Sequence, residues 1–275
     1  MNNVKIYGPG NSVSCFPQKV TKTFTEILLL LIAAAFISSC KKTEVKPAGA
    51  DLTIVNAVVG CYSMLTNFNG GGPLYYNSGA NQVAYGLFYA PTDELNHYTG
   101  LQHLALYNFP DTLKTDKPIV NLAINLPAGS IHTLFVSGTL ESPDTLFVAD
   151  NVPYHSLSDS TTSFRFVNLS KGSNPVSINL TGQPSGSVVS RLPYKGITKF
   201  INFPATSDIG TYTFEFRDIA TDTLIAKLNA RDVGVPGMLY APNKYQFRSN
   251  TIELFGTPGT SDFFTMQRVG LISNY

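Results

Sequence analysis

The sequence of 275 residues has no tryptophan, only 13% charged residues and only three cysteines. The cysteines stand at positions 15, 40 and 61, so there is no Cys-x-x-Cys pair, which excludes a zinc knuckle and a thioredoxin-type motif. The formal net charge of +1 gives no basis for binding nucleic acid, and we expect no nucleic-acid partner. Hydrophobic residues make up 43% of the chain, enough for a sizeable core in one or two domains.

Long hydrophobic runs are also scarce, and the one that stands out lies near the N-terminus. Residues 27–37 contain no charge, but a membrane-spanning helix needs about 20 apolar residues. A run of this length suits the core of a signal peptide, and Lys19 and Lys22 supply the basic residues that precede such a core. Residues 1–18 form a longer prelude than usual, which leaves a start further downstream open.

The apolar run ends at residues 37–40, Ile-Ser-Ser-Cys, which resemble a bacterial lipobox: an aliphatic residue, two small residues and a cysteine. The resemblance implies that residues 1–39 are a signal peptide and that Cys40 carries a diacylglycerol thioether. Acyl chains hold a protein at a membrane because each buried methylene contributes about 0.8 kcal/mol. Residues 40–50 are polar and aperiodic, as in a tether. The alternatives are an uncleaved anchor helix, or a signal peptide cut near Ser39 with Cys40 incidental.

The distribution of charge divides the rest of the chain into two halves. Residues 51–153 have more acidic than basic residues, whereas residues 163–275 have more basic than acidic ones. Between them, residues 154–162 are rich in Ser, Thr and Asp, which is typical of a linker. We therefore predict two domains, although the asymmetry is equally compatible with drift of solvated surface charge.

Short alternating runs predict strands throughout both halves. In the segment 212–217, aromatic Tyr212, Phe214 and Phe216 alternate with polar residues, so one face is buried and the other is wet. Gly, Pro, Asn and Asp interrupt such runs about every 8–12 residues, as in a sandwich or barrel. The predicted fold is all-β, with two tandem Ig-like antiparallel sandwiches of roughly seven strands each. The Cys–Trp–Cys core of antibody domains is absent.

The two halves also resemble each other in sequence. Residues 52–70 align with 164–182, and the dipeptide Val-Asn at 55–56 falls opposite the same dipeptide at 167–168. Near the far end of each half, Thr133, Gly138 and Asp144 fall opposite Thr251, Gly256 and Asp262. We interpret this as a tandem duplication of one β-domain.

The segment 164–182, FRFVNLSKGSNPVSINLTG, resembles the opening of domains in a family of uncharacterised lipoproteins of the Bacteroidota type. Those domains begin with a strand ending in Val-Asn, a loop containing proline, and then a second strand before a glycine. In the first half, Pro175 has no counterpart. The resemblance implies an extracytoplasmic β-sandwich with a lipid anchor, often in two copies, and it implies no catalytic residues.

Motifs for chemistry are weak. There is no Gly-x-Ser-x-Gly nucleophile elbow, and the glycines at 70–72 lack the Gly-Lys-Ser/Thr ending of a phosphate-binding loop. His97 and His103 lack the spacing of a zinc helix, and the acidic residues beside His97 fit a solvated loop better than a metal site. A glycosidase pair drawn from residues 93–116 cannot be placed from sequence. Cys61 is expected to be a buried core cysteine or a residue at a strand edge, and not a nucleophile. We expect no catalytic residues, no metal and no cofactor.

Tyrosines are concentrated between residues 62 and 107, and they are the strongest hint of a binding surface. A tyrosine offers a flat face for a sugar or peptide and a hydroxyl for its rim. The alternative is that these rings fill the two faces of a strand. The candidate ligand-binding residues are Tyr75, Tyr76, Tyr85, Tyr89 and Tyr98.

Three Asp-Thr-Leu segments, at 111–113, 144–146 and 222–224, resemble sites that are O-glycosylated in the Bacteroidota periplasm. Asp-Thr also commonly opens a turn before a strand.

Together these patterns predict a non-enzymatic protein of the cell envelope, lipid-anchored at the outer membrane and facing either the periplasm or the cell surface. Its sandwich loops would bind a glycan, a peptide or another envelope protein. The alternatives are an accessory carbohydrate-processing hydrolase and a purely structural spacer. The sequence leaves the oligomeric state open.

Overall fold

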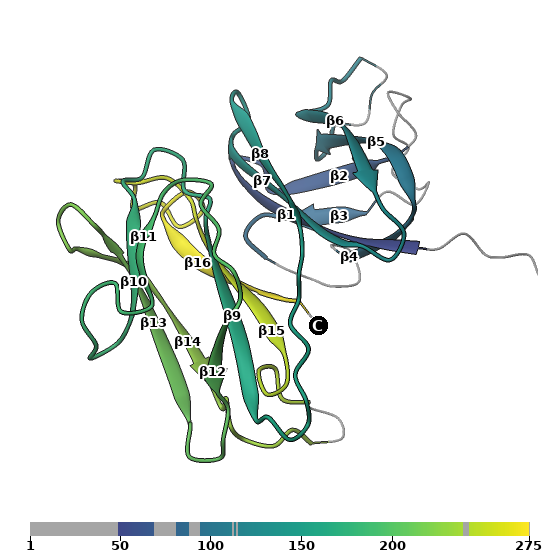
Figure 1. Ribbon diagram of the computed structural model, residues 1–275. Coiled ribbons are helices and arrows are strands. Elements are labelled where there is room, and N and C mark those ends of the chain that lie inside the picture. The colour runs from purple at the N-terminus through teal and green to yellow at the C-terminus, as the bar shows by residue number, and fades with distance from the viewer. Residues whose placement is uncertain are drawn as a thin grey trace, which may run out of the picture. The chain divides into compact units, whose positions relative to one another are not determined.

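The computed structural model describes residues 49–68, 81–87, 94–111, 113, 115–238 and 242–274, with the backbone alone at residues 94 and 96–98 (Figure 1). All of them belong to one compact unit, residues 47–275. The predicted signal peptide, Cys40 and most of the predicted tether lie outside the described residues. Among the residues described, no helix has the length and apolar character needed to cross a membrane.

The described residues form sixteen strands and no helix, which confirms the all-β prediction. Strands β1–β8 form two four-stranded sheets, and we call this part the first repeat. Their orders are β4 (Glu94–Tyr98), β1 (Gly49–Val59), β7 (Ile131–Thr139), β8 (Pro143–Ala149), and β3 (Gln82–Ala84), β2 (Ser63–Asn67), β5 (Gly100–Asn108), β6 (Val120–Leu126).

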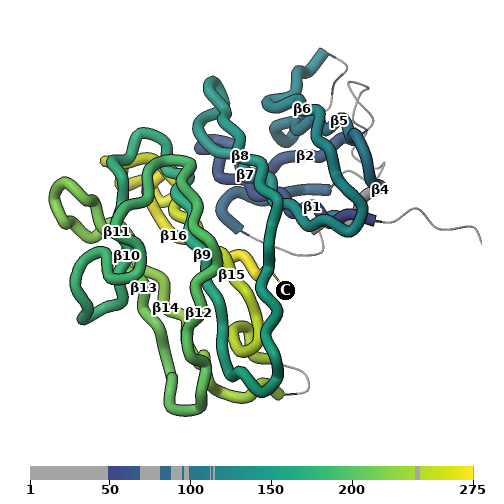
Figure 2. Tube along the Cα trace, viewed as in Figure 1, coloured from purple at the N-terminus to yellow at the C-terminus, as the bar shows by residue number. Residues whose placement is uncertain are grey.

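Strands β9–β16 form two further four-stranded sheets, and we call this part the second repeat. Its two sheets lie in two layers (Figures 1 and 2). The orders are β12 (Ile201–Pro204), β9 (Thr161–Asn168), β15 (Ser249–Phe255), β16 (Arg268–Ser273), and β11 (Val189–Leu192), β10 (Val176–Leu180), β13 (Thr211–Asp218), β14 (Leu224–Arg231).

Every strand pairing of the first repeat recurs in the second when each strand number is raised by eight. The recurrence includes the one parallel pairing in each repeat, β1 with β7 and β9 with β15. All other pairings between named strands are antiparallel, as expected, and each repeat has eight strands where the sequence suggested about seven. A duplicated domain has this pattern of pairing.

Alternation places the core between the two sheets of each repeat. On β13, Phe214 and Phe216 are fully buried while Glu215 between them is not, as the period of two predicts. Phe214 packs edge-on against Phe164 and Phe166 of the opposite sheet, with ring centroids 4.9 and 5.2 Å apart. Aliphatic residues of β1, β5 and β7 fill the equivalent space in the first repeat.

The recurring Val-Asn dipeptide has a structural role at the end of β1 and of β9. The Asn56 side chain is fully buried, accepts from the Val58 N–H and donates to the carbonyl of Val83 on β3. Asn168 is equally buried, accepts from the Ser170 N–H and donates to the carbonyl of Leu192 on β11. Each asparagine therefore joins the first strand of its repeat to the opposite sheet. The requirement for these bonds explains why the asparagine recurs.

The two repeats share a buried seam between the sheets that contain β1 and β9. Its apolar part combines Val55, Ala57, Tyr85 and Phe135 of the first repeat with Val167, Leu169, Phe255 and Ile272 of the second. Its polar part is an ion pair between Arg165 and Asp150, whose side chains are 3% and 1% exposed. The Arg165 guanidinium also donates to the hydroxyls of Thr133 and Thr251.

The predicted linker, residues 154–162, overlaps the second repeat, because β9 begins at Thr161. His155 within it is buried, with its Nδ1 2.9 Å from the Thr161 hydroxyl. Its Nε2 lies 3.2 and 3.3 Å from the hydroxyls of Ser163 and Ser249. The linker is thus fastened to the beginning of β9 and of β15.

Candidate ligand-binding site

The clearest difference between the repeats is the connection that follows their sixth strand. In the first repeat, residues 127–130 join β6 to β7 in a tight turn. In the second repeat, residues 232–248 join the equivalent strands β14 and β15. Insertions on a repeated scaffold map to loops, and loops held by a rigid scaffold commonly carry binding residues. The longer connection is therefore the candidate position for a binding site.

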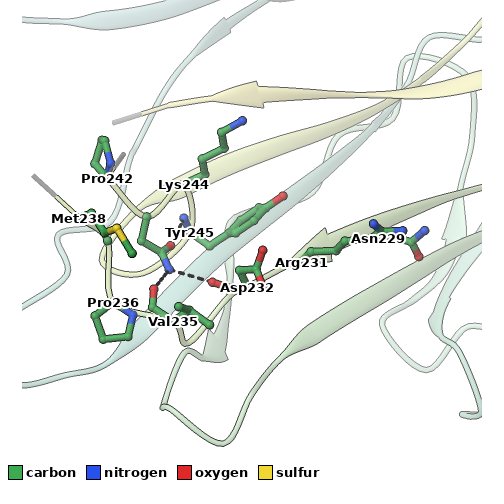
Figure 3. Close-up of a pocket in the computed structure, with 11 residues that line it drawn as sticks. Asn229, Arg231, Asp232, Val235, Pro236, Met238, Pro242, Lys244 and Tyr245 are labelled. Carbon is green, nitrogen blue, oxygen red and sulfur yellow. Dashed lines mark hydrogen bonds between the residues drawn. The ribbon is translucent and has the colours of Figure 1, made fainter. Parts of the chain in front are cut away.

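This connection forms a hollow of about 440 Å³, which we call the loop pocket (Figure 3). Asn229 and Arg231 at the end of β14 line one side. The remaining described lining residues are Asp232, Val235, Pro236, Gly237, Met238, Pro242, Asn243, Lys244 and Tyr245. The volume lies within the range of small-molecule sites, about 300–1,000 Å³.

Asn243 gives the loop pocket its shape. Its Nδ2 donates to the carbonyls of Asp232, Val233 and Val235. Its Oδ1 accepts from the N–H groups of Tyr245 and Gln246, 2.6 and 2.8 Å away. The three bonds from Nδ2 join the two arms of the connection, and the two to Oδ1 fix the turn that follows Asn243. The pocket is preformed, and a ligand does not have to order these arms.

Close backbone approach also holds the loop together. A Cβ added to Gly237 would lie 2.3 Å from the backbone nitrogen of Asn243, closer than any side chain can stand. Only glycine therefore fits at this position. Any larger residue has to push the two arms of the connection apart and alter the pocket.

The rim of the loop pocket is mainly cationic. The Arg231 and Lys244 side chains are exposed, and Arg248 lines an adjoining hollow of about 570 Å³. Among the described residues that line the loop pocket, Asp232 is the one carboxylate. Asp232 lies near the buried ring of Tyr245 (Figure 3). Burial first, and then this negative charge, raise the pKa of Tyr245, so the phenol stays protonated at neutral pH.

A second hollow, of about 490 Å³, lies at the seam between the repeats. Its lining includes Val148 of the first repeat, Ile197 and Lys199 of the second, and buried Arg165. The guanidinium of Arg165 is already committed to Asp150 and two threonine hydroxyls, and it stacks 4.8 Å from the ring of Phe200. This hollow is therefore lined mainly by groups that hold the seam together.

The tyrosines predicted to bind ligand are spread between described and undescribed parts of the chain. Tyr75, Tyr76 and Tyr89 lie outside the described residues, and Tyr98 contributes described backbone to β4. Tyr85 is buried in the seam, where its ring meets Phe255 edge-on at 5.3 Å and Arg268 stacks on it.

The environment of Tyr85 fits the alternative in which the tyrosines fill space. Burial raises the pKa of Tyr85 to about 12, although Arg268 opposes the shift. A tyrosine platform formed by the other rings stays a prediction.

Cys61 and His132 hold structural positions, whereas His103 is exposed on β5. Cys61 is buried, and burial raises the pKa of its thiol to about 11, so the thiol stays largely protonated at neutral pH. His132 is buried and stacks on Phe147 at 4.9 Å. Within the part of the chain that the structure describes, no three His, Cys, Asp or Glu side chains are grouped to hold a metal.

The Asp-Thr-Leu segments differ in their surroundings. Asp144 pairs with Lys195 across the seam at 2.6 Å, and Thr145 beside it is half-buried. Thr223 is exposed in the hairpin between β13 and β14. Thr112 lies outside the described residues. Glycosylation at these threonines stays a prediction.

Sequence reasoning missed the loop pocket. Its connection contains the run Val-Gly-Val-Pro-Gly at 233–237 and Pro242-Asn243, which is typical of an ordinary turn. The available signal was the alignment of the two repeats, because the segment that precedes Thr251 is longer than the one that precedes Thr133.

Comparison with known proteins identifies no family: no family model matches the chain, and no curated protein matches its sequence. Among solved structures, a candidate adhesin from Bacteroides ovatus is similar over 84% of this chain and 94% of its own, with 10% identity and a TM-score of 0.24. A family 41 carbohydrate-binding module from streptococcal virulence factors, studied for alpha-glucan recognition, is similar over 81% of this chain and 96% of its own, with 8% identity and a TM-score of 0.23. TM-scores this low support no conclusion about the ligand of this chain. The described residues form an all-β protein of two repeated sandwich-like units.

Proposed function

We propose that this chain is a lipid-anchored, non-enzymatic protein of the cell envelope that binds a ligand in the loop pocket. The observation that carries the binding role is the Asn243 side chain, whose hydrogen bonds to Asp232, Val233 and Val235 join the two arms around the hollow, in a connection that is much shorter in the first repeat. The anchoring role is supported by the apolar run at 27–37 and the lipobox-like residues that end at Cys40.

Binding is favoured over hydrolysis because the polar groups of the loop pocket are engaged in holding the fold. The Asn243 amide is used in full by the loop, and Asn229 Oδ1 accepts from the Thr213 hydroxyl at 2.8 Å. A glycosidase needs two carboxylates facing one sugar ring. The described lining of the loop pocket offers Asp232 alone. These features suit a site that recognises a ligand and leaves it unchanged.

The anchor is tested by growing cells that express the full chain with labelled palmitate. We expect the label on the wild-type protein and on a Cys15→Ser variant, and we expect a Cys40→Ser variant to lose it. The matched control matters because both substitutions remove one N-terminal thiol. Retention of label by Cys40→Ser would show that anchoring does not use this cysteine.

Ligand binding is tested with the full chain in detergent on combined glycan and peptide arrays. We expect a ligand that is retained by a Gly210→Ala variant and lost by Gly237→Ala. Gly210 is the matched control, because a Cβ there meets nothing within 4 Å, whereas a Cβ at Gly237 strikes the backbone of Asn243. If the wild-type chain binds nothing on either array, the spacer alternative replaces this proposal.

A further inference from the structure

The charges around the loop pocket point to the sign of its ligand. Arg231, Lys244 and Arg248 are exposed around this hollow and the adjoining one, and Asp232 is the one carboxylate among the described residues that line them. Exposed charges of one sign at a rim accelerate the encounter with a ligand of the opposite sign and reject ligands of the same sign. The ligand is therefore anionic at the end that meets the rim.

The walls of the loop pocket point to the rest of the ligand. Val235 is 49% exposed and Met238 is 79% exposed, and Pro236 and Pro242 are exposed beside them (Figure 3). Apolar side chains this open to water gain free energy when a ligand covers them, by roughly 25 cal/mol for each Å² removed from water. Methionine also adapts its shape to different apolar groups. The ligand therefore carries at least one apolar side group.

The same lining favours a peptide over a saccharide. A sugar needs an open aromatic face or several free amide and carboxylate groups, but Tyr245, the aromatic ring among the described lining residues, is only 8% exposed. The Asn243 amide is also used in full by the loop. Prolines, valine and methionine beside basic groups instead match an aliphatic side chain followed by an acidic one. We propose, on the basis of the binding role above, that the loop pocket captures an acidic peptide segment with an apolar side chain, supplied by a partner protein.

The proposal sets the expected strength of the interaction. A pocket of this size covers only a few side chains, so the contact falls in the class of small, transient interfaces. Because the cations lie at an exposed rim, the affinity should fall as ionic strength rises. We therefore expect weak, salt-dependent binding.

The first experiment measures peptide binding by the full chain in detergent. The probe is a synthetic peptide array in which the numbers of acidic and apolar residues vary independently. We expect binding to require both, with loss when every glutamate is replaced by lysine or every leucine by serine. Polygalacturonate serves as an acidic saccharide without apolar side groups, and we expect it to bind at least tenfold more weakly than the best peptide.

The second experiment locates the bound peptide. The chain has no tryptophan, so Met238→Trp places the single indole of the protein at the rim of the loop pocket and keeps the wall apolar. We expect the fluorescence of this indole to shift as peptide is added, with the same midpoint as the binding curve. An unchanged spectrum at saturating peptide would show that the peptide binds elsewhere and would overturn the proposal.

Charge exchange tests the contact itself. Arg231→Glu combined with Lys244→Glu should weaken binding of the acidic peptide by about tenfold, because two exposed attractive charges become repulsive. The same variant should gain affinity for the lysine peptide, a result that damage to the fold cannot produce. Arg191→Glu combined with Lys199→Glu makes the same change of net charge away from the pocket and should leave both affinities unchanged.

The outcomes separate this inference from the binding role on which it rests. Tighter binding of polygalacturonate than of any peptide, with loss in Gly237→Ala, would overturn the peptide proposal and keep the pocket as a binding site. Peptide binding that does not respond to charge exchange would also overturn it. If no probe binds and the wider arrays are silent, both proposals fail.

Discussion

The two repeats keep the same strands and differ most clearly at the seam and in the connection after their sixth strand. Asp150 and Asn274 hold equivalent places in the two repeats. The backbone N–H of Asp150 donates to the carbonyl of Ile131, and that of Asn274 donates to the carbonyl of Ser249. The side-chain oxygen of each also accepts a hydrogen bond from a threonine hydroxyl. The first repeat has the charged residue at this place, and Arg165 of the second repeat neutralises it. We conclude that the two repeats keep the same backbone hydrogen bonds at this place. The first repeat supplies the carboxylate of the ion pair between them, and the second supplies the guanidinium.

The largest expected effect follows from removing Arg165. Arg165→Met leaves the Asp150 carboxylate buried without its cation, so we expect the free energy of unfolding to fall by about 3–5 kcal/mol. Combining it with Asp150→Asn makes the first repeat resemble the second at this place and should recover most of the loss. Chemical denaturation followed by circular dichroism measures both variants.

A second ion pair in the same seam provides the control. Lys195 and Asp144 are 2.6 Å apart, but their side chains are 34% and 32% exposed. Water screens such a pair, so Lys195→Met should cost no more than about 1 kcal/mol. Equal losses for the two methionine variants would show that burial does not decide the value of these pairs.

The next effect concerns the feature that the repeats share. Asn56→Ala and Asn168→Ala each remove the donor for a buried carbonyl, of Val83 or Leu192, and the acceptor for a backbone N–H. Each should lower the free energy of unfolding by about 2–4 kcal/mol, since an unsatisfied buried polar group costs about 1–3 kcal/mol. Exposed Asn121→Ala on β6 is the control, with a change below about 0.5 kcal/mol. A large loss in only one repeat would mean that the shared dipeptide has lost its role in the other.

Much of the fold could be predicted from the sequence because its signals are local or periodic. The alternation at 212–217 predicted the buried face of β13, and Phe214 and Phe216 are buried. The recurring Val-Asn indicated a repeated unit before any contact was known. Its partners on β3 and β11 could not be read from the sequence, because they lie 27 and 24 residues away.

The candidate site was harder to predict because it depends on bonds between residues that show no periodicity. Asn243 reaches the carbonyl of Asp232, eleven residues earlier, and nothing in the run of glycine and proline between them marks this bond. Tyr85 shows the opposite difficulty. Its neighbours in sequence suggested a surface ring, but the seam that covers it is formed by Phe255, far along the chain. A high density of tyrosines in the sequence does not show whether their rings lie on an open surface or are buried between two repeats.

We expect His155 to make the stability of the second repeat depend on pH. Burial lowers the pKa of His155 below its ordinary value of 6.5, and nearby Asp159 opposes the shift. The neutral ring is therefore favoured by folding: the stability is fully present above pH 6.5 and is lost as pH falls through the lowered pKa of the folded state. The free energy of unfolding of wild type should fall more steeply below pH 6.5 than that of His155→Gln. Parallel curves for the two proteins would assign the acid sensitivity to other groups.

The smallest expected effect compares Cys61 with Ser173, which stand at equivalent places beside the two buried asparagines. Asn56 Nδ2 lies 3.8 Å from the Cys61 sulfur, and Asn168 Nδ2 donates to the Ser173 hydroxyl at 3.2 Å. Cys61→Ser keeps a donor for the Ser63 carbonyl, which the thiol now contacts at 3.3 Å, and loses the buried sulfur. We expect a loss of about 1 kcal/mol in the free energy of unfolding, from the reduced apolar volume. Ser173→Cys, at a half-exposed place, should change it by less than about 0.5 kcal/mol. If Cys61→Ser costs as much as Asn56→Ala, the thiol contributes more than filled space, and the two repeats are not interchangeable even at the residue that their shared asparagine contacts.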